Sequence, residues 1–209
     1  MMLCSTHFSE LAGKMLGWFF TNYIEVIATL TGLIYLVYSV KGAILLWLFG
    51  IITSLLYVYI FFRAAIYADM GINVYYVLIS IYGWFHWKYG TREDKKELPV
   101  QKLGIHTGIV LLLVSLLIFI LIAIVLDRFT DSDIVGWDAF TTAFSITATW
   151  MLARKIKEHW LVWIVVDLVS AGLYIYKQLY PTVLLFVVYT TLAIVGYFSW
   201  QRIWREQQT

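Results

Sequence analysis

The chain has 209 residues, of which 62% are hydrophobic and only 13% are charged. Soluble globular domains are about half apolar and about a quarter charged, so this composition excludes an ordinary soluble domain and indicates a protein embedded in lipid. The net charge of +2 is too small to suggest a nucleic-acid partner. The single cysteine, Cys4, excludes an intramolecular disulfide and a thiolate metal site.

The N-terminal segment 1–21 is predicted to be an extracytoplasmic tail and not a cleavable signal peptide. It begins with a stretch that contains Glu10 and Lys14 and has no apolar core of its own, whereas a signal peptide needs one. The first apolar segment is therefore expected to remain in the protein as a helix.

Seven apolar segments follow, and each is predicted to cross the membrane as a helix. They are residues 22–40, 43–62, 67–87, 106–126, 137–152, 160–176 and 181–200. A helix needs about 20 residues to cross about 30 Å of hydrocarbon, so the fifth and sixth segments are short for that task.

The distribution of lysine and arginine predicts the orientation of these helices. With seven crossings, the connections alternate between the two sides of the membrane. Most of the 15 basic residues fall on the side that takes the 88–102 loop, the 154–157 loop and the C-terminus, while the other side takes the acidic stretch 127–138. Because the cytoplasmic side is the positive one, the N-terminus is expected outside and the C-terminus inside a bacterial inner membrane.

An internal repeat divides the chain. Residues 74–87 (VYYVLISIYGWFHW) and 187–200 (VVYTTLAIVGYFSW) share Val, Tyr, Ile, Gly, Phe and Trp at a constant offset. Upstream, LYVY in the second segment echoes LYIY in the sixth, and Trp47 echoes Trp163. The second and third segments therefore resemble the sixth and seventh.

This order predicts an all-α integral membrane fold of seven transmembrane helices, built as two three-helix repeats joined by one linking helix (3+1+3). Because one crossing separates the repeats, both enter the membrane from the same side and are parallel. The expected domains are a first repeat at 22–87, a cytoplasmic loop and linking helix at 88–126, a second repeat at 127–204 and a cytoplasmic tail at 205–209. Transporters are built this way, with the substrate site between the halves near the midplane.

Asp167 is the strongest candidate for a functional residue because it lies in the middle of the sixth segment. Charged groups at that depth are costly and mark substrate or ion sites. Trp160, Trp163 and Asp167 are spaced i, i+3 and i+7, which places them on one helix face. Two indoles and a carboxylate suit a flat aromatic cation, at roughly 0.5–2 kcal/mol for each cation–π contact. The alternatives are an Asp167 that is protonated or bonded to a hydroxyl, and tryptophans that anchor the helix at the interface.

Asn73 and Tyr76, early in the third segment, are further candidates, because an amide there can bind a polar substrate group. Asn73 can equally be an interface residue near Asp69. The hydroxyl side chains between residues 141 and 149 of the fifth segment are interpreted mainly as groups that bond back to helix carbonyls or pack against neighbouring helices.

Several motifs together make the chain resemble a known family. They are TGLIYL at 31–36, WLFGIITSLLYVYIFF at 47–62, YADMGINVYY at 67–76, YGWFHW at 82–87 and the tryptophan motif at 160–167. Over about residues 17–205 the chain resembles the Pnu family of bacterial vitamin transporters, whose best-known members are nicotinamide riboside transporters of the PnuC type. The resemblance implies a 3+1+3 architecture related to that of the SWEET sugar transporters. It also implies facilitated diffusion, with a cytoplasmic kinase that traps the product, and it allows a trimer.

Two departures from the family pattern fall at expected substrate positions. The riboside-transporter signature WxxWxxxN ends here in Asp167, and where many of those transporters have Gln after the ADMG stretch, this chain has Asn73. The resemblance to this family also implies thiamine as a substrate of some members, and thiamine is likewise a flat aromatic cation. The resemblance therefore implies a vitamin transporter, with nicotinamide riboside as the first expectation and thiamine as the alternative.

The sequence thus predicts a transporter that moves a cationic vitamin across the inner membrane by alternating access. The expected substrate contacts are Trp163 and Asp167, which hold the ring, and Trp160, Asn73, Tyr76 and Trp47 as weaker contacts.

Two other classes of protein remain as alternatives. An integral membrane enzyme would need convergent catalytic groups, and the candidate catalytic residues here are Glu158, His159 and the 92–97 charge run. A non-transporting scaffold subunit would need no buried carboxylate. No cofactor is expected. No metal site is expected either, because the histidines are dispersed and only His7 has a possible second ligand, Glu10.

Overall fold

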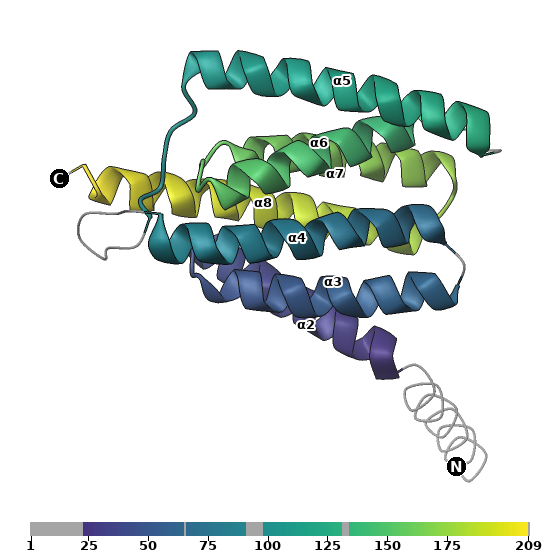
Figure 1. Ribbon diagram of the computed structural model, residues 1–209, viewed down its shortest axis with the longest axis horizontal. Helices are drawn as coiled ribbons and strands as arrows, with labels where there is room; N and C mark the ends of the chain where they lie inside the picture. The colour runs from purple at the N-terminus through teal and green to yellow at the C-terminus, as the bar shows by residue number, and fades with distance from the viewer. Residues whose placement is uncertain (1–22, 65, 91–97, 131–133, 209) are drawn as a thin grey trace, which may run out of the picture.

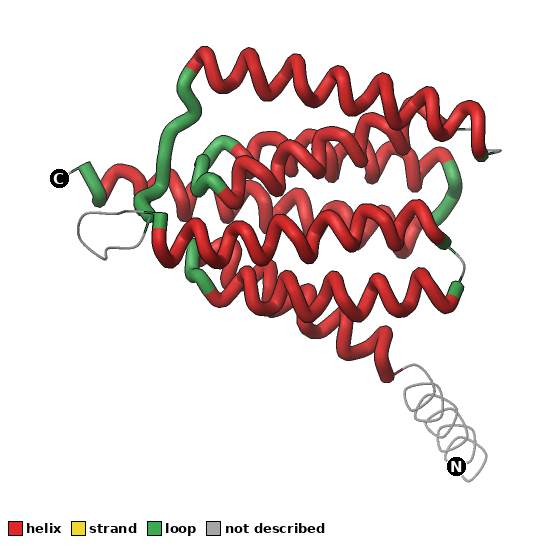
Figure 2. The backbone as a smooth tube through the Cα atoms, in the orientation of Figure 1, coloured by secondary structure: helices red, strands yellow, loops and turns green. Residues whose placement is uncertain are grey.

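The computed structural model describes residues 23–64, 66–90, 98–130 and 134–208, and within them every regular element is a helix (Figures 1 and 2). The helices are α2 (Tyr23–Lys41), α3 (Leu45–Arg63), α4 (Tyr67–Tyr89), α5 (Ile105–Phe129), α6 (Val135–Ala153), α7 (His159–Tyr176) and α8 (Tyr180–Glu206). The all-α fold class is confirmed, and each of the seven predicted segments is a helix. The largest difference between a predicted and an observed helix end is at the C-terminus of α8. The predicted 1–21 tail lies outside the described residues.

Five of the described helices, namely α2, α3, α5, α7 and α8, are long and apolar enough to cross a membrane by length and composition. The chain is therefore a multi-pass membrane protein. The other two helices carry more polar residues, such as Asn73 in α4 and the hydroxyls of α6. Ser145, Thr147 and Thr149 of α6 are all buried. Protein covers these side chains instead of lipid, so α6 needs less apolar surface than a lipid-facing helix.

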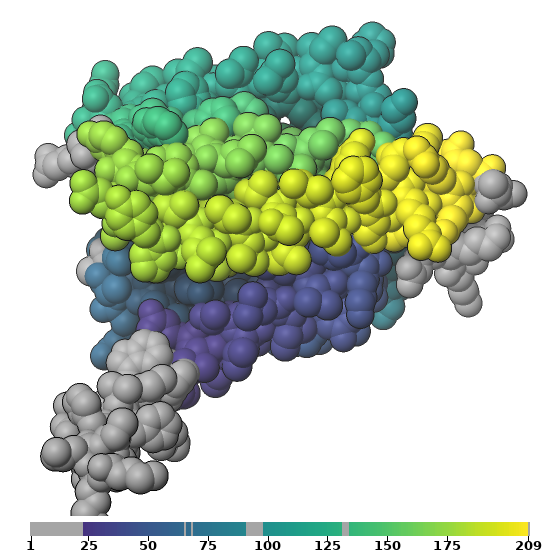
Figure 3. All heavy atoms as spheres, turned by 180° about the vertical axis from the view of Figure 1, so that it is seen from behind, coloured from purple at the N-terminus to yellow at the C-terminus, as the bar shows by residue number. Residues whose placement is uncertain are grey.

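The helices pack as two groups with α5 at one edge. In one group α3 packs against both α2 and α4, and in the other α7 packs against both α6 and α8. The groups meet where α2 touches α8 and where α4 touches α6, whereas α5 packs against α6 alone among the described helices. Seen from behind, α8 and α2 lie as neighbouring bands and α5 forms the far edge (Figure 3).

Tryptophans pack over glycines at two places in the core. A Cβ atom added to Gly83 in α4 would lie 2.5 Å from the indole of Trp47 in α3, and one added to Gly196 in α8 would lie 2.5 Å from the indole of Trp160 in α7. Only glycine permits so close an approach. Trp47 and Trp160 thus have similar surroundings, whereas the sequence comparison pairs Trp47 with Trp163.

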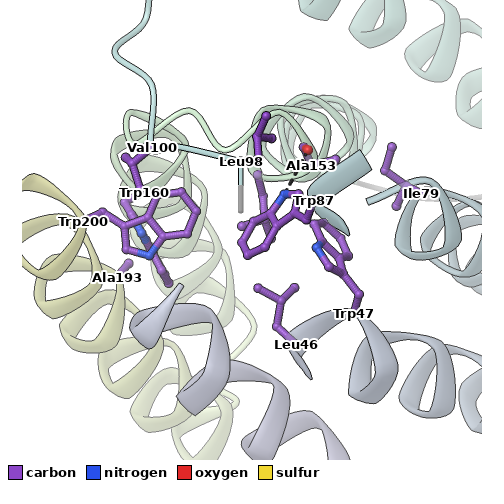
Figure 4. Close-up of a cluster of buried hydrophobic side chains, with 11 residues drawn as sticks. Leu46, Trp47, Ile79, Trp87, Leu98, Val100, Ala153, Trp160, Ala193 and Trp200 are labelled. Atoms are coloured by element: carbon purple, nitrogen blue, oxygen red, sulfur yellow. Dashed lines mark hydrogen bonds between the residues drawn. The ribbon is translucent and has the colours of Figure 1, made fainter. Parts of the chain in front are cut away.

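The C-termini of α2, α4, α6 and α8 lie at the same end of the molecule. We call it the basic end because Lys41, Lys88, Arg154 and Arg202 lie there. Its core contains Trp87 and Trp200, whose rings lie 6.0 Å apart. The Trp87 indole donates a hydrogen bond to the carbonyl of Ala153 at 3.1 Å, which Figure 4 shows as a dashed line. The Trp200 indole donates to the carbonyl of Ser39 at 2.9 Å. Each of these bonds joins one helical group to the other.

A short strap, residues 98–101, crosses the basic end between α4 and α5. Leu98 and Val100 are buried in the tryptophan cluster (Figure 4). The amide of Gln101 donates to the carbonyl of Lys155 at 2.8 Å, and the amide of Lys157 donates to the carbonyl of Gln101 at 3.0 Å. The strap is therefore fastened to the loop between α6 and α7 and helps to cover this end.

Candidate functional site

Two adjoining cavities lie between the helical groups. The main cavity, of about 490 Å³, is lined by α2 and α3 on one side and by α7 and α8 on the other. The side cavity, of about 250 Å³, is lined by α2, α3, α4, α6 and α7. Both cavities are lined by Tyr35, Thr53, Tyr57 and Trp163. The main cavity falls within the 300–1,000 Å³ typical of small-molecule sites.

Asp167 lines the main cavity together with Trp163 and Trp160, as the helical spacing predicts. Its side chain is buried, and within the described part of the chain its carboxylate has no hydrogen-bond or ion-pair partner. Tyr189 of α8 lines the same cavity and interacts electrostatically with Asp167. A buried charge without a fixed partner is costly, and a cationic ligand in the cavity would compensate that cost.

Trp160 closes the main cavity toward the basic end. It is only 3% exposed, its ring packs over Gly196, and it contacts the rings of His159 at 4.6 Å and Trp200 at 6.3 Å. Its indole nitrogen is buried without a hydrogen-bond partner among the described residues. Trp160 is therefore part of the floor of the cavity, and Trp163 stands above it between the two cavities.

Asn73 and Tyr76 line the side cavity. The Asn73 amide donates to the backbone carbonyl of Asp69 at 2.8 Å, which holds its side chain along α4. The Tyr76 side chain interacts with Ser145 of α6. Asn73 and Tyr76 thus reach the site from α4, in the cavity that shares Trp163 with the main cavity.

Trp47 is the one expected substrate contact that lines neither cavity. It is fully buried, packs over Gly83, and meets Trp87 edge to face at 5.4 Å. The physical reason is the small size of Gly83, which draws the indole of Trp47 into the contact between α3 and α4. We therefore replace the predicted substrate contact with a packing role.

Sequence reasoning missed several lining residues. Tyr35, Thr53 and Tyr57 come from α2 and α3, and Tyr189 comes from α8. The internal repeat contained a signal for Tyr189, because it is the repeat partner of Tyr76. For the other residues the sequence carries no such signal, since tyrosines are common throughout these helices.

The hydroxyl side chains of the fifth segment, now α6, mainly bond back to carbonyls of their own helix, as the sequence predicts. Thr141 donates to the carbonyl of Trp137 at 3.0 Å, Thr147 to that of Ala143 at 3.2 Å and Thr149 to that of Ser145 at 2.8 Å. These are bonds within α6. Thr149 in addition lines the side cavity.

The residues that an enzyme would have used are engaged in structural contacts. The Glu158 carboxylate accepts a hydrogen bond from the amide of Leu103 at 2.8 Å and pairs with Lys157 at 2.9 Å. The His159 ring lies 2.7 Å from the carbonyl of Ile156 and packs on two tryptophan rings. The 92–97 run, His7 and Glu10 lie outside the described residues, and in the described part no three metal-ligating side chains cluster.

Among the described residues, two groups of three helices with α5 at their edge enclose an aromatic cavity that holds one buried carboxylate, and this arrangement defines a membrane transporter. Comparison with known proteins agrees with this class. The chain belongs to the nicotinamide mononucleotide transporter family, whose model matches residues 22–202. The resemblance to the Pnu family is thereby confirmed, and because that family consists of transporters, an enzymatic function is not supported.

Individual relatives are distant but cover nearly the whole chain. The nicotinamide riboside transporter PnuC of Escherichia coli is 24% identical over 91% of this chain and 90% of its own length. The protein of the same name from Neisseria mucosa is 24% identical over 87% of this chain and 73% of its length. The fold is similar to that of a crystal structure of the vitamin B3 transporter PnuC, with a TM-score of 0.70 and 22% identity over 93% of this chain and 88% of that one.

Proposed function

We propose that this transporter carries nicotinamide riboside across the inner membrane into the cell by alternating-access facilitated diffusion. The observation that carries the proposal is the buried Asp167 carboxylate beside Trp163 in the main cavity. The nicotinamide ring of the riboside is a flat aromatic cation, so a carboxylate can neutralise it and an indole can stack on it. The nicotinamide riboside transporters among its relatives support the same substrate.

The proposed architecture is two parallel triplets, α2–α4 and α6–α8, joined by α5, with the domain limits expected from the sequence. Corresponding contacts support it. Trp47 over Gly83 in the first group matches Trp160 over Gly196 in the second. The two inter-group indole bonds also run in opposite directions, one from α4 to α6 and the other from α8 to α2.

The turns after α2 and α6 correspond as well. Gly42 has φ +64° and Lys155 has φ +58°, so each triplet leaves its first helix through a residue in the left-handed conformation. Glycine is the usual residue there. Lys155 adopts the conformation despite its side chain, whose ammonium group lies 4.5 Å from the centre of the Trp87 ring.

We further propose that the basic end is cytoplasmic and that the site faces outward in this structure. Contacts between the groups gather at the basic end, where Ser199 and Trp200 bond to the end of α2, Trp87 bonds to α6, and the strap covers the cluster. Toward its N-terminal end, α2 leans away from the other helices (Figure 1). Inward release then requires the triplets to rock apart at the basic end, with the strap releasing its bonds.

Thiamine is a second candidate because two residues differ from the riboside-transporter pattern. Asp167 supplies an anion where the signature has an amide, and Asn73 replaces the glutamine of many members. Both residues line the cavities. A carboxylate can accept hydrogen bonds from the aminopyrimidine of thiamine in addition to balancing its charge.

Uptake of labelled substrate into proteoliposomes tests both candidates. We expect saturable uptake of nicotinamide riboside down its gradient, without ATP or an imposed ion gradient, and weaker competition by thiamine. Protein-free liposomes and proteoliposomes with Trp163→Ala are the controls. If only thiamine enters, the substrate is the second candidate, and if neither vitamin enters faster than in protein-free liposomes, the proposed substrate class is wrong.

A further inference from the structure

A separate cleft of about 540 Å³ opens between α4, α5 and α6. It exists because α5 packs against α6 but not against α4 among the described helices. Its lining residues are Tyr75, His106, Thr107, Val110, Leu111, Val114, Ile118, Ile146, Thr147 and Trp150. None of them lines the main or side cavity, so this cleft is not part of the substrate site.

The cleft has the depth of one bilayer leaflet. Its lining runs along α5 from His106, at the basic end, to Ile118. At a rise of about 1.5 Å per residue this segment is roughly 18 Å long. Half of a hydrocarbon core of about 30 Å is about 15 Å, so the cleft reaches from the basic-end interface to about the middle of the membrane.

The deep part of the cleft presents hydrocarbon. Its polar groups are engaged with one another or with the backbone: the Tyr75 hydroxyl donates to the carbonyl of Ile146 at 2.9 Å, and Ser115 and Thr147 share a hydrogen bond of 2.7 Å. The remaining deep surface comes from Val114, Ile118 and other aliphatic side chains of α5. Such a surface fits an acyl chain and offers little to a water-soluble ligand.

The mouth of the cleft, at the basic end, is polar and positive. His106 and Thr107 are exposed there, and the guanidinium of Arg154 lies 5.7 Å from the centre of the Trp150 ring. Arg154 also donates a hydrogen bond to the Tyr82 hydroxyl at 3.2 Å, and these two contacts hold its guanidinium beside Trp150, which lines the cleft. Basic pockets between transmembrane helices on the cytoplasmic side suit anionic lipid head groups.

We propose that this cleft binds one anionic phospholipid of the cytoplasmic leaflet, with an acyl chain between α4 and α5 and the phosphate at Arg154 and His106. The proposal uses the orientation proposed above but not the identity of the substrate. The lipid would separate α5 from α4 and cover Tyr75 and Trp150, leaving α5 attached through α6.

Native mass spectrometry of the full chain, with phosphatidylglycerol or phosphatidylcholine added, tests the site. Wild type should retain phosphatidylglycerol at a several-fold lower lipid concentration than phosphatidylcholine. Val110→Trp fills the cleft and should lose most of both adducts, whereas Leu113→Trp, on the same helix but outside the lining, should behave as wild type. Arg154→Gln should remove the preference for the anionic lipid, and Arg205→Gln, the same charge change on α8, should keep it.

Several outcomes would overturn the proposal. It is wrong if wild type retains both lipids equally, or if Arg154→Gln and Arg205→Gln lose the same amount of phosphatidylglycerol. It is also wrong if Val110→Trp changes the mass of the oligomer while keeping the lipid, because a second copy of the chain would then be the occupant. Binding of the vitamin by each variant, measured in the same samples, shows whether the substrate site is intact.

Discussion

Replacement of Asp167 tests the candidate site most directly, because the change can be made without disturbing the fold. The carboxylate is buried and has no hydrogen-bond or ion-pair partner among the described residues, so Asp167→Asn keeps the shape and removes only the charge. A hydrogen bond to a charged group contributes about 1.5–3 kcal/mol, and a neutral one about 0.5–1.5 kcal/mol. The exchange therefore costs roughly 1–2 kcal/mol of binding, or about a 5- to 30-fold rise in Kd for a cationic vitamin.

Asp167→Ala removes the whole interaction and should raise Kd about 10- to 150-fold on the same basis. Isothermal titration of the purified protein with nicotinamide riboside, and separately with thiamine, measures both variants. Glu25→Gln is the matched control, since it makes the same change at an exposed carboxylate on α2, and it should leave Kd unchanged. A folded Asp167→Ala protein that binds both vitamins within about twofold of wild type would show that the main cavity does not hold the cation.

Three further outcomes follow from the geometry. Trp163→Ala removes the indole between the two cavities and, at about 0.5–2 kcal/mol for a cation–π contact, should raise Kd for the vitamin about 2- to 30-fold in the same titration. Gly83→Ala places a Cβ 2.5 Å from the Trp47 ring and should destabilise the protein by about 1–3 kcal/mol in a thermal unfolding assay. The control is Gly71→Ala, on the same helix with nothing within 4 Å, which should have little effect. Equal losses of stability in the two variants would contradict the packing role of Gly83. Trp47→Phe should lower thermal stability but keep Kd near the wild-type value, and a large rise in Kd with unchanged stability would restore Trp47 as a substrate contact.

The membrane class, the seven helices and the grouping of three side chains at the candidate site were accessible from the sequence because they depend on local properties. Apolar runs of sufficient length must lie in lipid, and the spacing of Trp160, Trp163 and Asp167 places them on one face of any helix they form. The structure keeps all three on the main cavity. The conspicuous position of Asp167 also needed no tertiary information, since a carboxylate in the middle of an apolar segment is costly wherever the helix packs.

Only the tertiary structure decided which helices complete the site. Tyr35 and Tyr57 line the candidate site because α2 and α3 face α7 and α8 across the main cavity. Trp47 lies outside the site because its ring packs over Gly83 in the contact between α3 and α4. The sequence already showed that α4 and α6 carry polar residues, but the reason that a membrane protein can accommodate them is their contact with each other and, for α6, with α5 and α7. Helical periodicity determines which residues share a face, but the meeting of two faces depends on side-chain shapes contributed by segments far apart in the chain.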